Sequence, residues 1–351
     1  MFAVAKDQKA DRPPLEERPL LTFALFAYNQ EKYIREAIEG AFAQTYEPLE
    51  IIISDDCSTD RTFEIMNEMA NLYTGPHNIK VRRNTFNVGT ALHVYLAFLD
   101  ARGALFVVAA GDDVSLPTRT SEIFFAWNKA SRPPGLIHSG RETFNDAFPG
   151  DTQPYPANML GDGHDVLKIF ALPCWLPAAA PTCAYTREVF ELFPPLFGGS
   201  IIEDVPLLLR SALIGNYIKC DLPLIRQRVH TESSGSGYRL AEPKRWNRFM
   251  QSKQIAFRNM QSDLSNWHGD SDPKTLADIE KNILQVLVAT SQLFLPEGRS
   301  LSWFEKLKLI LVMLRSQAIS ERFRARCGHI IIFFGFESMR KFLGKALKVN
   351  H

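Results

Sequence analysis

Four stretches rich in apolar residues recur along the first 110 residues, and each of the first three is followed by a segment with helical periodicity. They are Leu20–Phe26, Leu49–Ile53, Ile79–Val81 and Leu105–Ala110. Short apolar runs of this kind predict buried strands, and strands that alternate with helices predict a mostly parallel sheet covered on both faces. We therefore predict an α/β fold for this part of the chain.

The segments between these strands place apolar residues on one helical face. In the first segment these residues are Ile34, Ala37, Ile38, Ala41 and Phe42, at positions i, i+3, i+4, i+7 and i+8. We expect Asn29 to cap that helix and Ser58, Thr59 and Asp60 to start the next one. A third helix is predicted over Thr90–Leu99.

The alternation weakens between Pro133 and Pro181, a segment rich in Pro, Gly and Asn. A long loop-bearing segment inside a compact domain is commonly a binding element. Regular structure is predicted again as helices over 187–192 and 204–214 and as strands over 217–220 and 225–229. After a Ser/Gly-rich loop at 233–237 the pattern is helical. These changes predict a flexible leader over 1–19, one domain over 20–237 and a basic helical region over 238–351.

Charge is unevenly distributed along the chain. Residues 299–351 contain eleven Lys and Arg against three Asp and Glu, a net charge of +8, whereas the preceding 29 basic and 36 acidic residues give −7. This tail has two apolar helical stripes flanked by Lys and Arg, around Trp303–Leu314 and Met339–Leu347. A cationic amphipathic helix is typical of a membrane interface. We expect the second stripe to contact membrane lipid rather than nucleic acid. For the first stripe, packing on the second stripe and on the domain over 20–237 is favoured over membrane contact.

Cysteine usage and hydropathy indicate the compartment. The five cysteines are scattered without a CxxC pair, which predicts free thiols in a reducing cytoplasm. The first 19 residues lack an apolar signal core. The longest apolar runs, 309–314 and 330–334, are much shorter than the roughly 20 residues that span a bilayer. We predict a cytoplasmic protein associated peripherally with the inner face of the cell membrane.

Acidic pairs follow two of the predicted strands and open a later helix. They are Asp55-Asp56, Asp112-Asp113 and Glu203-Asp204. In an open α/β sheet, ligands bind beyond the carboxyl ends of the strands. Tyr28, after the first strand, and Asp55-Asp56, after the second, would share that crevice, where a planar base could stack on the ring and donate to a carboxylate. The alternative is that the two Asp residues only cap the next helix.

The other acidic pairs have two interpretations each. Asp112 and Asp113 after Gly111 suit Mg²⁺ or Mn²⁺, which take one or two carboxylates and fill their other positions with phosphate oxygens and water; an ordinary Asp-rich turn is the alternative. Asp204 could be a general base, or only the cap of its helix beside Glu203. His230 could contact a metal or phosphate, although a lone His is more often structural. In the loop-bearing segment, Trp175 and Thr182 are candidates for acceptor binding, although a buried structural Trp is more common.

Together these motifs resemble those of the family 2 glycosyltransferases, which have a nucleotide-diphospho-sugar transferase (GT-A) fold. The resemblance covers about residues 20–235 and is specific through the order and spacing of its motifs. The matching stretches are Phe26–Ile34, Gln44–Tyr46, Glu50–Asp60, Asn87–Gly89, Gly111–Val114 and Ile202–Arg210. Cys57 stands where the family usually has the glycine of its Asp-Asp-Gly-Ser element.

The resemblance implies an inverting, metal-assisted transfer of a sugar from a UDP- or dTDP-sugar to a glycan or lipid-linked acceptor in cell-surface polysaccharide synthesis. Asp113 and His230 would hold Mg²⁺ or Mn²⁺, and Asp204 would deprotonate the acceptor hydroxyl, with Glu203 beside it. The remaining residues implied in nucleotide-sugar binding are Ala27, Tyr28, Asn29, Asp55, Asp56, Asn87, Gly89 and Asp112.

Three other classes of function compete with this interpretation. The main alternative is a non-catalytic glycosyltransferase-like module that binds a sugar nucleotide or glycan, but such a module would often have lost one of Asp56, Asp113 and Asp204. A nucleotidyltransferase would usually need a Gly-rich, basic phosphate loop near the first strand, and 26–33 contains no glycine. No GxGxxG follows Phe26, which disfavours a dinucleotide-dependent oxidoreductase. No motif specifies the sugar, the acceptor or the oligomeric state.

Overall fold

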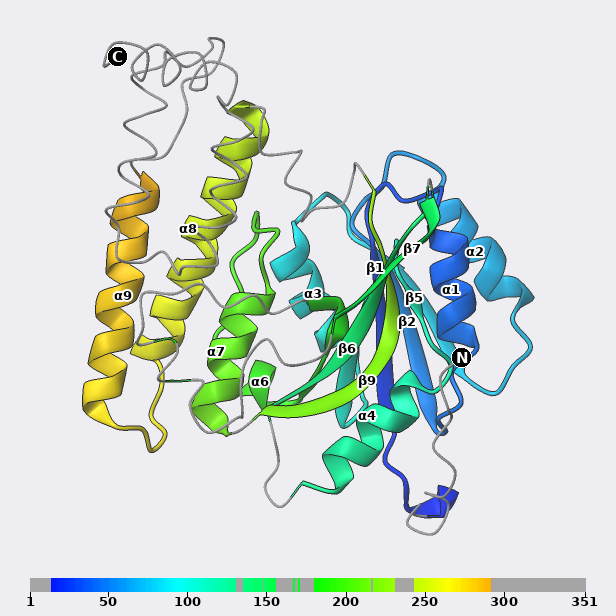
Figure 1. Ribbon diagram of the computed structural model, residues 1–351, viewed down its shortest axis with the longest axis horizontal. Helices are drawn as coiled ribbons and strands as arrows, with labels where there is room; N and C mark the ends of the chain where they lie inside the picture. The colour runs from blue at the N-terminus through cyan, green and yellow to red at the C-terminus, as the bar shows by residue number, and fades with distance from the viewer. Residues whose placement is uncertain are drawn as a thin grey trace, which may run out of the picture.

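The computed structural model describes residues 14–130, 135–146, 148–155, 167, 170, 180–215, 217–230 and 243–291. Within these ranges a nine-stranded sheet has helices on both faces (Figure 1). The strands are β1 Leu21–Ala27, β2 Leu49–Asp55, β3 Asn78–Arg83, β4 Leu105–Ala110, β5 Val114–Ser115, β6 Leu136–Asn145, β7 Phe148–Tyr155, β8 Cys183–Thr186 and β9 Tyr217–Arg228. The helices are η2 Leu15–Glu17, α1 Ile34–Phe42, α2 Thr62–Leu72, α3 Thr90–Leu99, α4 Arg119–Asn128, η5 Ala180–Thr182, α6 Glu188–Glu191, α7 Asp204–Ile214, α8 Pro243–Ser265 and α9 Pro273–Ser291.

The sheet is mixed rather than mostly parallel. Its order is β3-β2-β1-β4-β8-β6-β9-β5, with β7 paired to β6. The first four strands of this order are parallel, and β6 is parallel to β9. The pairings β4–β8, β6–β8, β6–β7 and β5–β9 are antiparallel. The prediction of parallel pairing is therefore confirmed only for the N-terminal half, because β8 enters the sheet in the opposite direction.

Two apolar cores cover the two faces of the sheet. Phe23 and Leu25 of β1 pack with α1, α2 and α4, whereas Ala24 and Phe26 pack with α3, α6 and α7. Successive side chains of a strand point to opposite faces, so one fully buried strand contributes to both cores. This arrangement explains why β1, β2 and β4 are nearly uniform apolar runs.

Several predicted elements are confirmed, and others need correction. Helices over Thr90–Leu99 and Asp204–Ile214 and the strand over Leu105–Ala110 have the predicted bounds. The two strands predicted after Gly215 are one strand, β9. The predicted loop between Pro133 and Pro181 contains β6 and β7, and β6 lies inside the sheet between β8 and β9. The ten-residue β6 begins with two apolar residues and continues with mostly polar ones, so its sequence shows little strand periodicity.

The predicted cap of the first helix is also corrected. α1 begins at Ile34, and Asn29 adopts φ 52° in the preceding loop, where its Oδ1 accepts a hydrogen bond from the backbone N–H of Thr59 at 2.8 Å. Asn29 therefore joins the loops after β1 and β2 instead of capping α1. The cap predicted for α2 is present in part, because Asp60 Oδ1 accepts from the N–H of Thr62 at 3.0 Å.

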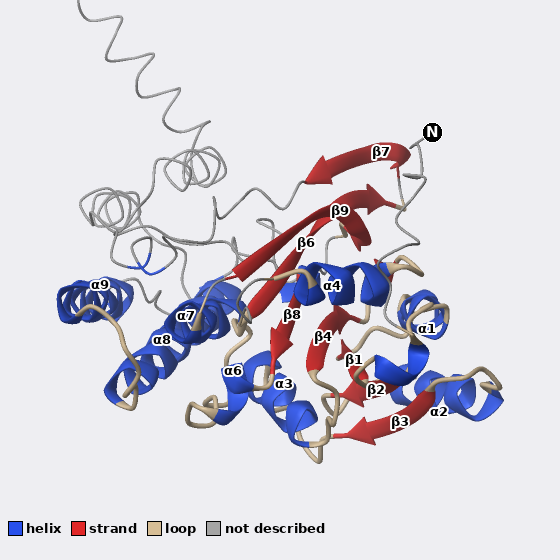
Figure 2. Cartoon of the chain, turned by 90° about the horizontal axis from the view of Figure 1, so that it is seen from below, coloured by secondary structure: helices blue, strands red, loops and turns tan. Residues whose placement is uncertain are grey.

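Helices α7, α8 and α9 stand side by side at the end of the molecule opposite α1 and α2 (Figures 1 and 2). A buried bidentate ion pair joins Arg210 of α7 to Asp263 of α8, with N–O distances of 2.9 and 2.8 Å. Helix α8 thus packs directly on the sheet-covering helices. The predicted boundary at 237/238 stays a prediction. No described helix is long and apolar enough to cross a bilayer, and both basic stripes predicted after residue 299 lie outside the described residues.

Candidate active site

The predicted ligand-binding edge forms first between β1 and β2. Ala27 pairs in register with Asp55, and the Asp56 N–H donates to the Ala27 carbonyl at 3.0 Å. The loop after β1 is tied to the loop after β2, since the Asn29 N–H donates to Ser58 Oγ at 2.9 Å. Tyr28 lies beside this junction with 41% of its surface exposed. The structure therefore brings Tyr28, Asn29 and the Asp55-Asp56 turn together, with an aromatic ring free for stacking.

Asp56 organises the turn after β3. Its Oδ1 accepts from the Asn84 side-chain amide at 2.8 Å and from the Val88 N–H at 3.0 Å, and its Oδ2 accepts from the Gly89 N–H at 3.0 Å. The Asn87 side chain donates to the Asp56 carbonyl at 3.3 Å. Asp56 is buried, and its carboxylate is already bound by three protein donors. Its predicted contact with a nucleobase would have to use the remaining lone pairs of these oxygens.

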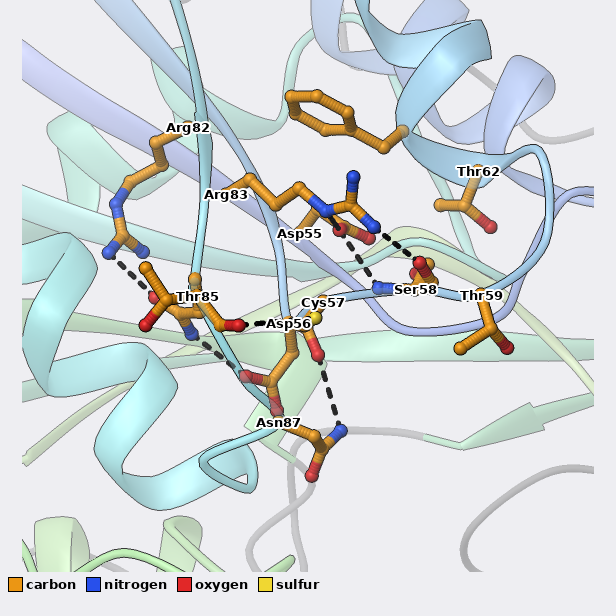
Figure 3. A network of polar contacts seen from close by, with 12 residues as sticks. Asp55, Asp56, Cys57, Ser58, Thr59, Thr62, Arg82, Arg83, Thr85 and Asn87 are labelled. Carbon is orange, nitrogen blue, oxygen red and sulfur yellow. Dashed lines mark hydrogen bonds and ion pairs between the residues drawn. The ribbon is translucent and has the colours of Figure 1, made fainter.

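Asp55 is held from the neighbouring strand (Figure 3). Its Oδ2 accepts from the Ser58 N–H at 2.9 Å and pairs with Arg83 Nε at 3.1 Å, while its buried Oδ1 has no hydrogen-bond partner among the described residues. Between Asp56 and Ser58, Cys57 adopts φ 63°, a left-handed conformation that favours glycine. This backbone geometry suits the glycine that the resembled family usually has at that position, and here a residue with a side chain adopts it.

This half of the site is completed by residues that the motifs did not indicate. Arg82 Nη1 donates to Ser54 Oγ at 2.7 Å, and its Nη2 donates to Asn84 Oδ1 at 2.9 Å. Ser54 Oγ also lies 2.6 Å from His93 Nε2, and burial lowers the pKa of His93 to about 4. The pairing of β2 with β3 places Arg82 opposite Ser54 and Arg83 opposite Asp55. The signal available in the sequence was therefore the position of both arginines at the carboxyl end of the third strand.

The second acidic pair follows β4, the other neighbour of β1. The Gly111 N–H donates to the Phe26 carbonyl at 2.8 Å, and a Cβ on Gly111 would approach Gln30 Oε1 to 2.4 Å. The Gln30 side chain could turn away, but the same Cβ would also lie 2.8 Å from the Cβ of Ala27, so a side chain at position 111 would push the two loops apart. Asp112 and Asp113 follow directly, and His230 Nε2 lies 3.1 Å from Asp112 Oδ2. The structure thus brings His230 to Asp112 at the end of β4, whereas the prediction paired His230 with Asp113 at a metal ion; that pairing stays a prediction.

Arg228 fixes this turn from β9. Its N–H donates to Asp113 Oδ1 at 2.9 Å, and its Nε donates to the Asp112 carbonyl at 3.1 Å. The guanidinium also pairs with Asp146 and Glu36 and lies over the rings of Tyr33 and Phe144, at 5.0 and 4.6 Å from their centroids. These partners come from α1 and the residue before it, from β6 and from the β6–β7 turn, so no local sequence pattern could reveal them.

Asp113 has the properties of a carboxylate that lacks a counter-ion. It is buried, and its Oδ2 has no hydrogen-bond partner among the described residues. Burial, followed by the neighbouring Asp112 carboxylate, raises the pKa of Asp113 well above its usual value. No three His, Cys, Asp or Glu side chains form a ready-made metal cluster within the described part of the chain. A buried carboxylate oxygen without a donor beside a second carboxylate nevertheless fits a divalent cation.

The third acidic pair opens α7. Glu203 is buried and precedes the helix, and Asp204 is its first residue, with Oδ1 accepting from the Val205 N–H at 3.0 Å. Burial raises the pKa of Asp204 to about 7. Burial, and then the charge of Asp204, raises the pKa of Glu203 to about 8. A carboxylate with a pKa near neutrality is suited to proton transfer, which a cap alone does not require.

The predicted acceptor residues are less informative. Thr182, in η5, is fully buried, and its carbonyl accepts from Ser139 Oγ at 3.3 Å, so its contact with an acceptor stays a prediction. Trp175 lies outside the described residues. Cys183, next to Thr182, begins β8, which runs antiparallel to β4 and therefore starts at the edge where β4 ends. The start of β8 and the Asp112-Asp113 turn thus lie at the same edge of the sheet.

Comparisons with known proteins agree with this geometry. Residues 22–187 match the family described as glycosyl transferase family 2. An uncharacterised glycosyltransferase of Haemophilus influenzae is 34% identical over 109 residues, which are 31% of this chain and 33% of that protein. The chain spans about a quarter to a half of the length of the curated relatives it matches.

Two solved structures share the fold. S. aureus TarS 1–349 in complex with UDP-GlcNAc is 18% identical with a TM-score of 0.54, over 87% of this chain and 83% of that one. The mannosyltransferase PcManGT from Pyrobaculum calidifontis, in complex with GDP-Man and Mn²⁺, is 18% identical with a TM-score of 0.52, over 89% of each chain. The predicted GT-A-type fold is confirmed, with the mixed sheet described above. Residues 22–187 thus match glycosyl transferase family 2, the family that the motifs resemble.

Proposed function

We propose that this protein transfers a sugar from a nucleotide-diphosphate-sugar donor to a hydroxyl group of an acceptor, with inversion at C1. The observation that carries the proposal is that one sheet edge gathers two acidic turns and an exposed aromatic ring. Tyr28, Asp56 and Asp113 follow the adjacent parallel strands β1, β2 and β4. This is the position at which open α/β sheets bind ligands.

The donor half of the proposal rests on the turn organised by Asp56. Tyr28 would stack on the base, and Asp55, Asp56, Asn87 and Gly89 would line its edge and ribose, with Ala27, Asn29 and Asp112 beside them. The donor is proposed to be a UDP-sugar or a dTDP-sugar. TarS with UDP-GlcNAc supports a uracil nucleotide, whereas PcManGT with GDP-Man shows that the same fold also holds a guanine nucleotide.

The metal half rests on the buried Asp113 Oδ2, which has no donor among the described residues. We propose that Asp113, with Asp112 and His230, holds Mg²⁺ or Mn²⁺. When bound, such a cation would supply positive charge for the leaving diphosphate. The Arg228 guanidinium and backbone would keep the turn in place, and the His230 ring would orient the Asp112 carboxylate through their 3.1 Å contact.

The acceptor half rests on Asp204. Its raised pKa, near 7, leaves much of it ionised at neutral pH but makes it basic enough to take a proton from an acceptor hydroxyl. A base on the face of the sugar opposite the leaving group gives direct displacement with inversion. Glu203 beside it would retain its own proton at neutral pH, which avoids a second buried negative charge.

The acceptor is proposed to be a glycan or a lipid-linked sugar of a cell-surface polysaccharide. The support is the cationic, amphipathic sequence of 299–351, which favours the inner face of a membrane, where lipid-linked acceptors would be reached. Deleting residues 335–351 tests this part: the protein should move from the membrane fraction to the supernatant at low salt, and unchanged partitioning would contradict it.

Isothermal calorimetry of the full chain against UDP, dTDP, GDP and CDP, each with and without Mn²⁺, tests the proposal. We expect one nucleotide to bind, more tightly with Mn²⁺. Well-folded protein that binds none of the four would contradict a donor site. Nucleotide-sugar binding that never leads to transfer with any glycan or lipid-linked acceptor would favour a non-catalytic module instead.

A further inference from the structure

Residues 197–202 form the segment that leads into Glu203 and Asp204. They run between helix α8 and the turn after β3 that Asp56 organises through Asn84, Val88 and Gly89, which we call the donor turn. On one side the segment contacts the turn that Asp56 organises. The Gly199 N–H donates to the Val88 carbonyl at 2.7 Å, and the Ala91 N–H donates to the Ser200 carbonyl at 3.1 Å. The segment before the proposed base is thus bonded to the same turn that would line the nucleotide.

This contact is too close for side chains. A Cβ on Gly89 would lie 2.9 Å from the Ser200 carbonyl oxygen, and Gly89 and Gly199 adopt φ 80° and 83°. Left-handed backbone at both positions favours glycine and brings the two backbones together. The Val88–Gly89 amides, which also bind Asp56, are therefore in direct backbone contact with the segment that precedes Asp204.

On its other side the segment is held by α8. Ser200 is fully buried. Its Oγ accepts a hydrogen bond from the Ile202 N–H at 3.0 Å, and its hydroxyl donates to the Ser252 carbonyl at 3.0 Å. The Ile201 N–H donates to Ser252 Oγ at 3.3 Å. Ser200 is therefore bonded through its carbonyl to Ala91, in the first turn of α3, and through its hydroxyl to α8 and to Ile202, the residue just before Glu203.

We propose that Ser200 is a positioning residue for Asp204 and that it transmits occupation of the nucleotide site to the proposed base. The path runs from the Asp56 carboxylate to the Val88 and Gly89 amides, across the backbone contact with Gly199 and Ser200, and through the Ser200 hydroxyl to Ile202. This inference rests on the proposed function, because Asp56 must lie in the nucleotide site and Asp204 must be the base.

Hydrogen exchange of the full chain, with and without UDP and Mn²⁺, tests the inference; another nucleotide replaces UDP if calorimetry selects it. Backbone amides of 199–205 should exchange at least about fivefold more slowly with nucleotide bound, the lower end of ordinary coupling between sites. In S200A this protection should be lost at 203–205 and kept at 84–91. With a suitable acceptor, S200A should lower kcat while leaving the donor KM unchanged.

S211A is the matched control. Ser211 is also fully buried, and its hydroxyl donates to the Leu207 carbonyl at 2.7 Å within α7, without contact to the donor turn. It should keep the full protection pattern. If S200A does not fold, S252A removes the acceptor of the Ile201 N–H and should weaken protection at 203–205 in the same way.

The outcomes separate the two proposals. Two results would overturn the coupling and leave the proposed function standing. In the first, nucleotide binds but protects only 27–29, 55–58 and 84–91. In the second, S200A shows the same protection as S211A. Well-folded protein without binding of any of the four nucleotides overturns the proposed function and the coupling with it.

Discussion

The acidic turn after β2 and the acidic pair that opens α7 use similar residues in different surroundings. The Asp56 carboxylate is buried among three donors, two of them backbone N–H groups. Glu203 is also buried and Asp204 is half-buried, but the one side-chain bond described for the pair comes from the Val205 N–H. Burial raises the pKa of Glu203 to about 8 and that of Asp204 to about 7.

This difference separates a preorganised carboxylate from a reactive one. A carboxylate that already accepts several hydrogen bonds is stabilised in its charged form and holds the backbone around it. A buried carboxylate with few donors is less stable when charged and binds protons more readily. The donor half of the site therefore has the properties of a rigid frame, and the α7 end has those of a proton acceptor.

The largest expected effect is that of D204N on transfer. The amide keeps the size of the side chain and can still accept from the Val205 N–H, but it cannot take a proton. We expect kcat to fall by about 10²–10⁴-fold, the usual contribution of a general base, while calorimetric nucleotide binding stays unchanged. E188Q, a change of the exposed acidic residue that begins α6, is the control and should leave both unaffected. Near-normal turnover of D204N would refute the base assignment.

The pH dependence of kcat/KM should report the same pair. Because the pKa of Asp204 is raised to about 7 and the base must be deprotonated, kcat/KM should fall about tenfold per pH unit below about pH 7. Glu203, with a pKa raised to about 8, is coupled to it, so the measured values belong to the pair. A profile that is flat between pH 5.5 and 8, with nucleotide binding also flat, would contradict the assignment.

Stability should respond in opposite directions to amide substitutions in the two regions. In D56N the side-chain NH₂ cannot accept from the backbone amides that Asp56 now satisfies. The free energy of unfolding should therefore drop by about 1–3 kcal/mol, the cost of a buried unsatisfied group. Thermal and urea unfolding measure this loss, and a D56N protein as stable as wild type would show that Asp56 does not hold the turn.

E203Q should behave differently as the pH rises. The folded-state pKa of Glu203 is raised above its unfolded value, so its contribution is fully present below about pH 4 and is lost as the pH rises through about 8. Gln does not ionise and avoids this loss. The stability of E203Q relative to wild type should thus increase between pH 5 and pH 9, by about 4 kcal/mol at most. A difference that stays constant with pH would contradict an enclosed, protonated Glu203.

The sequence predicted the elements whose burial pattern is local. β1, β2 and β4 are apolar throughout because both of their faces are covered, and α7 begins and ends at residues with clear helix signals, Asp204 and Gly215. Asp55-Asp56 and Asp112-Asp113 could be placed at one edge from the order of β2, β1 and β4, because parallel neighbours end together.

The remaining parts depend on contacts between distant segments. β6 pairs with β8 and β9, so its polar residues are buried by neighbours and not by a pattern of their own. Arg228 forms ion pairs with Glu36, 192 positions away in the sequence, and with Asp146, 82 positions away. Ser200 donates a hydrogen bond to the Ser252 carbonyl, 52 positions away. Each of these contacts supports a predicted site residue, yet none has a local signature.

The smallest expected effect concerns Cys57, inside the donor frame. It adopts φ 63°, where a side chain costs about 1 kcal/mol, and its Sγ lies 3.6 Å from the Thr85 carbonyl oxygen, which is at most a weak hydrogen bond. C57G should relieve the backbone strain, and part of the gain is offset by the greater freedom of glycine in the unfolded chain. We expect C57G to be more stable than C57A by about 1 kcal/mol in urea unfolding. C57A is the matched control, because it removes the thiol but keeps a Cβ in the strained position. If C57A and C57G were equally stable, the turn would have adjusted to the side chain, and the preference for glycine at this position would need a cause other than φ, such as the close approach of a bound nucleotide.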